Sequence, residues 1–231
     1  MRKTLWGALG TALVLALGQG LIPGSTQPAA QAAAKAAAPV TLVEGQNFLT
    51  LANPVPTEDP ARIEVLEAFS YGCVHCFDFE PSMRAWKAHL PADVQVDYLP
   101  ATFNSTFELY ARGYYAAKAL GIVAATHEKI FDTIWNGGLQ AKDPDSLANL
   151  YARVGADRAK FVEALNSLGV QAAISSAGLK AQRLKLEGTP TLYVDGKYQV
   201  LTNGATSYDD IMQRLEAVVA KVRAERKTAH H

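Results

Sequence analysis

The only two cysteines of the chain, Cys73 and Cys76, lie three positions apart. Directly before them, residues 63–69 form a run of apolar and β-favouring side chains, and residues 70–72 carry the turn-forming sequence Ser-Tyr-Gly. After them, apolar residues recur at the spacing of a helical face up to residue 90. The sequence therefore predicts a strand, a tight turn and a helix whose first turn holds both thiols.

This placement makes the two sulfurs chemically different. Two residues three apart on a helix share one face, close enough to close a small disulfide ring. Cys73 would sit at the helix N-terminus, where unpaired N–H groups and the helix dipole favour a thiolate, and His75 would add positive or donor character. Cys76 would be shielded one turn deeper. We therefore expect Cys73 to react with substrate and Cys76 to resolve the mixed disulfide.

Three other interpretations of the cysteine pair are open. A purely structural disulfide is common in exported proteins, but so short a ring adds little to folding stability. A structural zinc site needs four ligands, and the chain has only one such cysteine pair and a few scattered histidines, so we expect no metal. A chance pair is the third. The strand before the cysteines favours redox chemistry.

A second constellation is Gly188-Thr189-Pro190, just ahead of a β-rich segment. Proline is tolerated at the start of a strand, and cis peptide bonds concentrate at residues that precede proline. Taken alone, this tripeptide is better explained as an ordinary trans proline that separates a helix from a strand.

The N-terminus predicts an export signal. Arg2 and Lys3 precede an uncharged apolar stretch at 5–17, and small residues allow cleavage before Gln19. An uncleaved membrane anchor that ends near residue 22 is the alternative, although the stretch is short and broken by glycine. We expect a signal peptide at 1–18 and a periplasmic or secreted protein.

An alanine-rich segment at 19–39 follows and predicts a linker. The rest is globular in composition, with 49% hydrophobic and 19% charged residues. The chain has 22 basic and 22 acidic residues, so its charge gives no indication of a nucleic-acid partner.

The remaining pattern predicts an α/β fold with a helical insertion. We expect an edge strand at 41–43, the central strand at 63–69 and another at 94–99, with a helix from Cys73 to about 89 kinked by Pro81. Asp195-Gly196 would close a type I′ hairpin between strands 191–194 and 197–200, ahead of a helix at 207–226. Five further helices are expected at 107–120, 127–135, 144–151, 156–167 and 170–186. This order is that of a thioredoxin-like domain in two parts, 40–104 and 187–227, around an inserted helical subdomain at 105–186.

Residues 65–77, with the Cys-Val-His-Cys motif, and residues 188–198, with the Gly-Thr-Pro motif and the hairpin, together resemble the DsbA family of periplasmic thiol:disulfide oxidoreductases. The resemblance extends from about residue 41 to the C-terminus. It implies a thioredoxin-like fold and the introduction of disulfide bonds into exported proteins.

The resemblance also implies roles for single residues. Cys73 matches the exposed nucleophile, Cys76 its buried partner, and His75 the histidine that stabilises the thiolate. Pro190 matches a cis-proline that faces the disulfide. The remaining matches are Thr189, whose backbone would pair with a substrate strand, and Glu67, a buried acid that would accept the proton of Cys76 or else be satisfied by water or a neighbouring donor.

Three positions depart from the family pattern. Val74 replaces a common proline between the cysteines, Thr189 replaces a common valine, and Tyr98 replaces a lysine often found on the strand after the first helix. We expect Val74 and Thr189 to contact substrate and to tune redox potential, and none of the three to change the reaction type.

The resemblance implies reduced, unfolded exported proteins as substrates and a quinone-linked membrane oxidase of the DsbB type as the partner that restores the disulfide. It implies no bound cofactor, and the short segment before residue 63 predicts a monomer. The alternatives are a disulfide isomerase or reductase, which Thr189 favours, and a non-catalytic thioredoxin-like binding or chaperone module.

Overall fold

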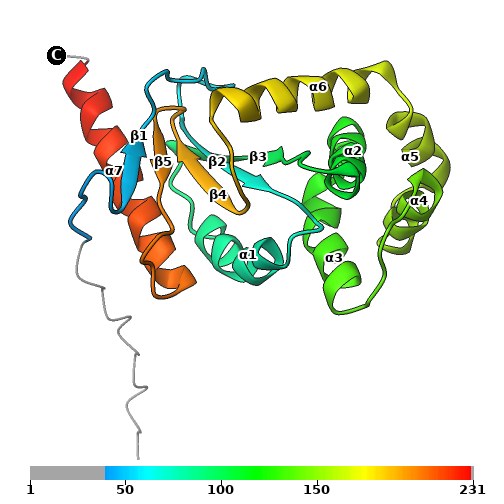
Figure 1. Ribbon diagram of the computed structural model, residues 1–231. Helices are drawn as coiled ribbons and strands as arrows, with labels where there is room; N and C mark the ends of the chain where they lie inside the picture. The colour runs from blue at the N-terminus through cyan, green and yellow to red at the C-terminus, as the bar shows by residue number, and fades with distance from the viewer. Residues whose placement is uncertain (1–39, 230–231) are drawn as a thin grey trace, which may run out of the picture. The chain divides into compact units, whose positions relative to one another are not determined.

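A computed structural model describes residues 40–229, in which a five-stranded sheet lies between helices (Figure 1). Its strand order is β1-β5-β4-β2-β3. Only β2 and β3 pair in parallel, and the other neighbours are antiparallel. The strands are β1 Phe48–Thr50, β2 Ile63–Phe69, β3 Val94–Pro100, β4 Thr191–Val194 and β5 Tyr198–Val200.

The central strand β2 is buried along its whole length, and its alternating side chains serve two different cores. Val65 packs with apolar residues of α1 (Val74–Lys87) and α7 (Tyr208–Ala229) on one face. Leu66 packs with residues of α6 (Leu168–Arg183) on the other. This alternation places Glu67 on the face that α1 covers.

Helices α2–α6 follow one another between β3 and β4, which confirms the predicted helical insertion. Figure 1 shows α2–α5 gathered to one side of the sheet, with α6 running back over it. They share a core rich in aromatic residues, which includes Tyr114, Phe131 and Tyr151. Their bounds are α2 Ser105–Ala119, α3 Val123–Trp135, α4 Pro144–Arg153, α5 Arg158–Leu165 and α6 Leu168–Arg183.

The hairpin turn has the predicted geometry. Asp195 and Gly196 have positive φ angles of 56° and 60°, and the Lys197 N–H donates to the Val194 carbonyl over 3.0 Å. A Cβ atom at position 196 would lie 1.8 Å from the Val55 carbonyl oxygen, so only glycine fits there.

The predicted edge strand at 41–43 is wrong. The N–H groups of Gln46 and Asn47 both donate to the Val43 carbonyl, and the Asn47 side chain accepts from the Val43 N–H. These bonds form a turn where the strand was expected. The first strand is instead β1, where Phe48 pairs with Val200 of β5.

The predicted signal peptide at 1–18 and linker at 19–39 lie outside the described residues. Within residues 40–229, no helix combines the length and the apolar character that a membrane span requires.

Candidate active site

Cys73 caps the N-terminus of α1, as predicted. Its Sγ accepts from the Cys76 N–H over 3.4 Å and lies 3.4 Å from the carbonyl oxygen of Thr189. The hydrogen bond with the Cys76 side chain lowers the pKa of the half-buried Cys73 thiol to about 6 against the opposing effect of burial, with further help from Thr189 and the backbone N–H groups of Cys76 and His75. Cys73 therefore favours a thiolate near neutral pH.

Cys76 has the opposite environment. Its side chain is fully buried in the core that lies between α3 and the end of β2. This burial raises the pKa of the Cys76 thiol far above its usual value. Both cysteines are free thiols in the structure. The reduced pair thus combines a stabilised sulfur at the surface with a protonated one beneath it.

The Gly188-Thr189-Pro190 segment lies against Cys73, although 116 positions separate Thr189 from it. The Thr189–Pro190 peptide bond is cis. Antiparallel pairing of β4 with β2 sets Thr191 opposite Ala68, so the end of β4 meets the turn that carries Cys73. The two motifs found in the sequence therefore form one site.

Glu67 lies beneath this site on β2, with 1% of its surface exposed. Burial, together with the nearby charges of Glu80 and Cys73, raises the pKa of its carboxyl to about 8 against the opposing effect of Lys87. Its Oε2 atom has no hydrogen-bond partner among the described residues. This environment fits an acid that exchanges a proton near neutral pH, and it gives no neighbouring donor for the alternative of a satisfied carboxylate.

The two residues between the cysteines are both exposed. Val74 is 41% exposed beside the reactive sulfur. The backbone N–H of His75 also helps to lower the pKa of Cys73.

The sequence analysis did not identify a group of interacting polar side chains that joins α1 to β3 and α3. Lys87 donates to Glu80 over 3.2 Å and to the hydroxyl of Tyr98. His127 of α3 faces Glu80, and the Tyr71 hydroxyl contacts the His127 ring. Glu80 follows Cys76 by one helical turn on the otherwise apolar face of α1, which was the available signal.

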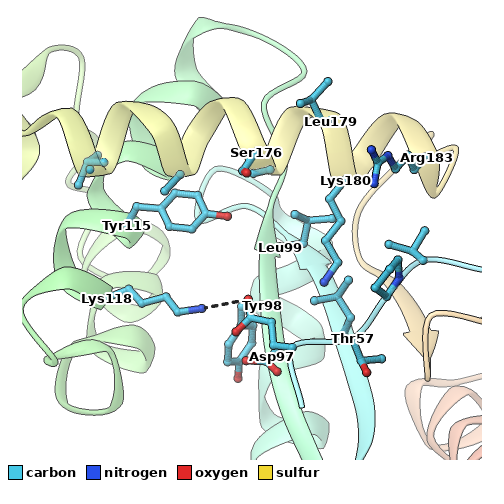
Figure 2. Close-up of a pocket in the computed structure, with 18 of the residues that line it drawn as sticks. Thr57, Asp97, Tyr98, Leu99, Tyr115, Lys118, Ser176, Leu179, Lys180 and Arg183 are labelled. Atoms are coloured by element: carbon cyan, nitrogen blue, oxygen red, sulfur yellow. Dashed lines mark ion pairs between the residues drawn. The ribbon is translucent and has the colours of Figure 1, made fainter. Parts of the chain in front are cut away.

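A separate cavity of about 710 Å³ lies on the other face of the sheet, between β3, α2 and α6. Figure 2 shows Tyr115 and Lys118 of α2, Asp97 of β3 and Lys180 of α6 around it. Lys118 pairs there with Glu58 at 3.9 Å. None of the predicted site residues lines this cavity. Within residues 40–229, no cluster of His, Cys, Asp and Glu side chains has the arrangement of a metal site.

Comparisons with known proteins identify the family of the chain. The model of the DSBA-like thioredoxin domain family matches residues 64–216. The thiol:disulfide interchange protein DsbA of Azotobacter vinelandii is 31% identical over 226 residues, which cover 97% of this chain and 99% of that protein. DsbA of Pseudomonas aeruginosa is 31% identical over 183 residues, 79% of this chain and 87% of that protein.

Solved structures of relatives have the same fold. The crystal structure of Pseudomonas aeruginosa DsbA matches with a TM-score of 0.75 at 31% identity, over 79% of this chain and 95% of that one. The oxidoreductase DsbA from Xylella fastidiosa matches with a TM-score of 0.74 at 31% identity, over 79% and 98%. The expected thioredoxin-like α/β fold is confirmed. The chain belongs to the DSBA-like thioredoxin domain family and is a thiol:disulfide oxidoreductase.

Proposed function

We propose that this protein oxidises pairs of thiols in exported polypeptides through Cys73 and Cys76. A substrate thiolate attacks Cys73 Sγ of the oxidised enzyme, which breaks the Cys73–Cys76 bond and leaves the electron pair on Cys76. Cys76 takes up a proton, and a mixed disulfide joins Cys73 to the substrate. A second substrate thiolate then attacks the substrate sulfur and releases Cys73 as a thiolate. The substrate gains a disulfide, and the enzyme gains two electrons.

The observation that carries the proposal is the difference between the two sulfurs. Because the helix N-terminus stabilises the Cys73 thiolate, with a pKa of about 6, the reduced enzyme is favoured relative to its disulfide. A disulfide of this kind accepts electrons readily. The site is therefore suited to oxidation of substrates.

Glu67 supplies and recovers the proton of Cys76. A carboxyl with a pKa of about 8 is largely protonated at neutral pH, so it can donate to Cys76 when that sulfur leaves. In the reverse step, the Glu67 carboxylate accepts the proton of the Cys76 thiol. Cys76 then does not have to exchange its proton directly with bulk water.

The substrate polypeptide lies across the surface formed by Val74 and the 188–190 segment. The Thr189 carbonyl already lies beside Cys73, so a substrate strand that pairs with the Thr189 backbone would present its own sulfur to Cys73 Sγ. Pro190 forms the wall opposite the cysteines, and the exposed Val74 offers an apolar contact. His75 acts through its backbone N–H on the Cys73 thiolate.

The cellular setting proposed for the enzyme follows from its N-terminus and its family. A signal peptide at 1–18 and a linker at 19–39 would deliver a monomeric domain to the periplasm, with thioredoxin-like parts at 40–104 and 187–227 and a helical subdomain at 105–186. Relatives bear the name thiol:disulfide interchange protein DsbA. A quinone-linked membrane oxidase of the DsbB type would restore the disulfide.

The decisive experiment is the equilibrium of Cys73–Cys76 with glutathione, combined with titration of the Cys73 thiolate by its ultraviolet absorbance. We expect an oxidising potential and a thiolate inflection near pH 6. An inflection near that of a free thiol, about 8.5, would contradict the oxidase mechanism.

Thr189 gives a specific reason to test isomerase or reductase activity as well. Refolding of a reduced multi-cysteine protein measures oxidation, refolding of a scrambled one measures isomerisation, and insulin turbidity measures reduction. Activity that survives Cys73→Ser in all three assays would favour a non-catalytic binding module instead.

A further inference from the structure

His127 of α3 is the buried titratable side chain closest to the site that the exchange reaction leaves without a role. It is 5% exposed and lies among the rings of Phe69, Tyr71, Tyr98 and Phe131. It belongs to the helical insertion, whereas the residues proposed to exchange protons and electrons lie on β2 and α1. A polar ring in such a core is costly unless its nitrogens interact with other groups.

Both ring nitrogens of His127 face polar side chains near the cysteines, one in the turn before α1 and one on α1. The Tyr71 hydroxyl lies 2.9 Å from Nδ1, and burial raises the pKa of Tyr71 well above its usual value, so the hydroxyl keeps its proton and can donate to Nδ1. A ring that accepts at Nδ1 carries its hydrogen at Nε2. Nε2 lies 3.4 Å from Glu80 Oε2, and this electrostatic contact is the one polar contact of either atom, since neither has a hydrogen-bond partner among the described residues.

This ring favours the charged form of Glu80. Burial raises the pKa of the Glu80 carboxyl, but His127 and Lys87 more than offset the burial, and the pKa falls below its usual value. The resulting Glu80 carboxylate is a like charge that raises the pKa of Glu67 in addition to the effect of burial. His127 of α3 therefore affects the protonation of Glu67 through the charge on Glu80.

We propose that His127 is a positioning residue for the redox reaction: held by Tyr71 of the active-site turn, it keeps Glu80 ionised and thereby sets the pH range in which Glu67 exchanges a proton with Cys76. This inference rests on the proposed role of Glu67. With this role of His127, the helical insertion contributes to proton exchange between Glu67 and Cys76, in addition to any contribution to substrate binding.

The pH range depends on all the titratable groups that face Glu67 and Glu80. They come from α1 and its N-cap, from β3 and from α3. These groups are Cys73, Cys76, Arg84, Lys87, Tyr98 and His127.

The test is an infrared titration of the carboxyl stretches in the reduced full-length protein, with the Glu67 and Glu80 bands assigned from Glu67→Gln and Glu80→Gln. In His127→Phe, which retains an aromatic ring, we expect Glu80 to titrate at higher pH and Glu67 at lower pH. A fall of about half a pH unit for Glu67 corresponds to a threefold rise in its ionised fraction. The inflection in the pH profile of mixed-disulfide resolution by Cys76 should move by the same amount.

Three further variants separate this role from a packing role. Tyr71→Phe removes only the hydroxyl and should shift both carboxyls in the same directions, so it replaces His127→Phe if that variant does not fold. In a Glu80→Gln background, His127→Phe should leave Glu67 unchanged, because the path through Glu80 is absent. His89→Phe, which removes an exposed histidine after α1, should move neither carboxyl.

Unchanged titration of Glu80 and Glu67 in both His127→Phe and Tyr71→Phe would overturn the proposal. An equal Glu67 shift with and without the Glu80 carboxylate would overturn it too, because it would show an effect of packing alone. These outcomes are independent of the oxidase function, since the Cys73 thiolate titration and the glutathione equilibrium measure that function separately.

Discussion

Glu67→Gln should stabilise the reduced protein, and the gain should grow with pH. The folded state holds the Glu67 carboxyl at a pKa of about 8, whereas the ordinary value is 4.5. Between these values the folded protein keeps a proton that the unfolded chain releases, so the stability that this carboxyl contributes is fully present below pH 4.5 and is lost as pH rises towards 8. Glutamine has nearly the same shape and no charge, so it removes this loss.

The size of the effect follows from the linkage between protonation and folding. Each pH unit between 4.5 and 8 costs the wild type about 1.4 kcal/mol of unfolding free energy relative to the variant. The difference should be near zero at pH 4.5, about 3 kcal/mol at pH 7 and about 4 kcal/mol at pH 8. Above pH 8 it should level off. The effects of titrating groups that do not interact with Glu67 cancel in the difference between the two proteins.

Urea unfolding of both proteins from pH 4.5 to pH 9, in the presence of a reductant, measures this difference directly. Glu163→Gln is a matched control, because Glu163 is exposed on α5 and should give no pH-dependent difference. A difference for Glu67→Gln that stays constant with pH, or that falls as pH rises, would refute the assignment of a protonated, buried Glu67.

Other perturbations test the rest of the site and its scaffold. The alkylation rate of Cys73 should rise with pH through an inflection near 6, and an inflection near 8.5 would contradict this. Cys76→Ser, whose hydroxyl can still donate to Cys73, should keep that inflection; when it is mixed with a disulfide-bonded polypeptide, Cys73 should attack the disulfide and remain in a mixed disulfide, as seen by mass spectrometry. Gly196→Ala places a methyl group against the Val55 carbonyl, so urea unfolding should show a loss of more than about 2 kcal/mol. Asp143→Ala removes the side chain that accepts from the Ser146 N–H at the start of α4, and it should cost about 1 kcal/mol in the same assay with no change in redox potential.

Strong local patterns made much of the fold predictable. The strands at 63–69 and 191–194 have the predicted bounds, because each is an apolar run between turn residues. Helix ends were less certain, since the residue that caps a helix is visible only in the structure. Asp157 caps α5 and Ser167 caps α6, so these helices begin at Arg158 and Leu168, where the predictions were 156 and 170.

The candidate site, too, was predictable from the sequence only in part. Sequence motifs and the family resemblance were enough to name Cys73, Cys76 and the 188–190 segment, and the structure brings them together. The contact of His127 with Glu80 joins residues on two helices from different halves of the protein, and no spacing rule connects them. Tyr98 was recognised only as a missing lysine, and the structure shows that Lys87 of α1 reaches it.

Lys87 supplies the site with a partly exposed cation in place of the lysine that relatives often carry on β3. Lys87 is the last residue of α1, where a positive charge is favoured by the helix dipole, and its long side chain reaches Glu80 and Tyr98. The cation thus lies on the same helix as both cysteines, and any movement of α1 would carry the thiols, Glu80 and Lys87 together. Glu67 on β2, Tyr98 on β3, His127 on α3 and Thr189 would change their distances to them. Proton exchange at Cys76 should therefore depend on how α1 packs against β2 and α3. The contact of His127 with Tyr71 helps to hold α3 in place beside the turn that leads into α1.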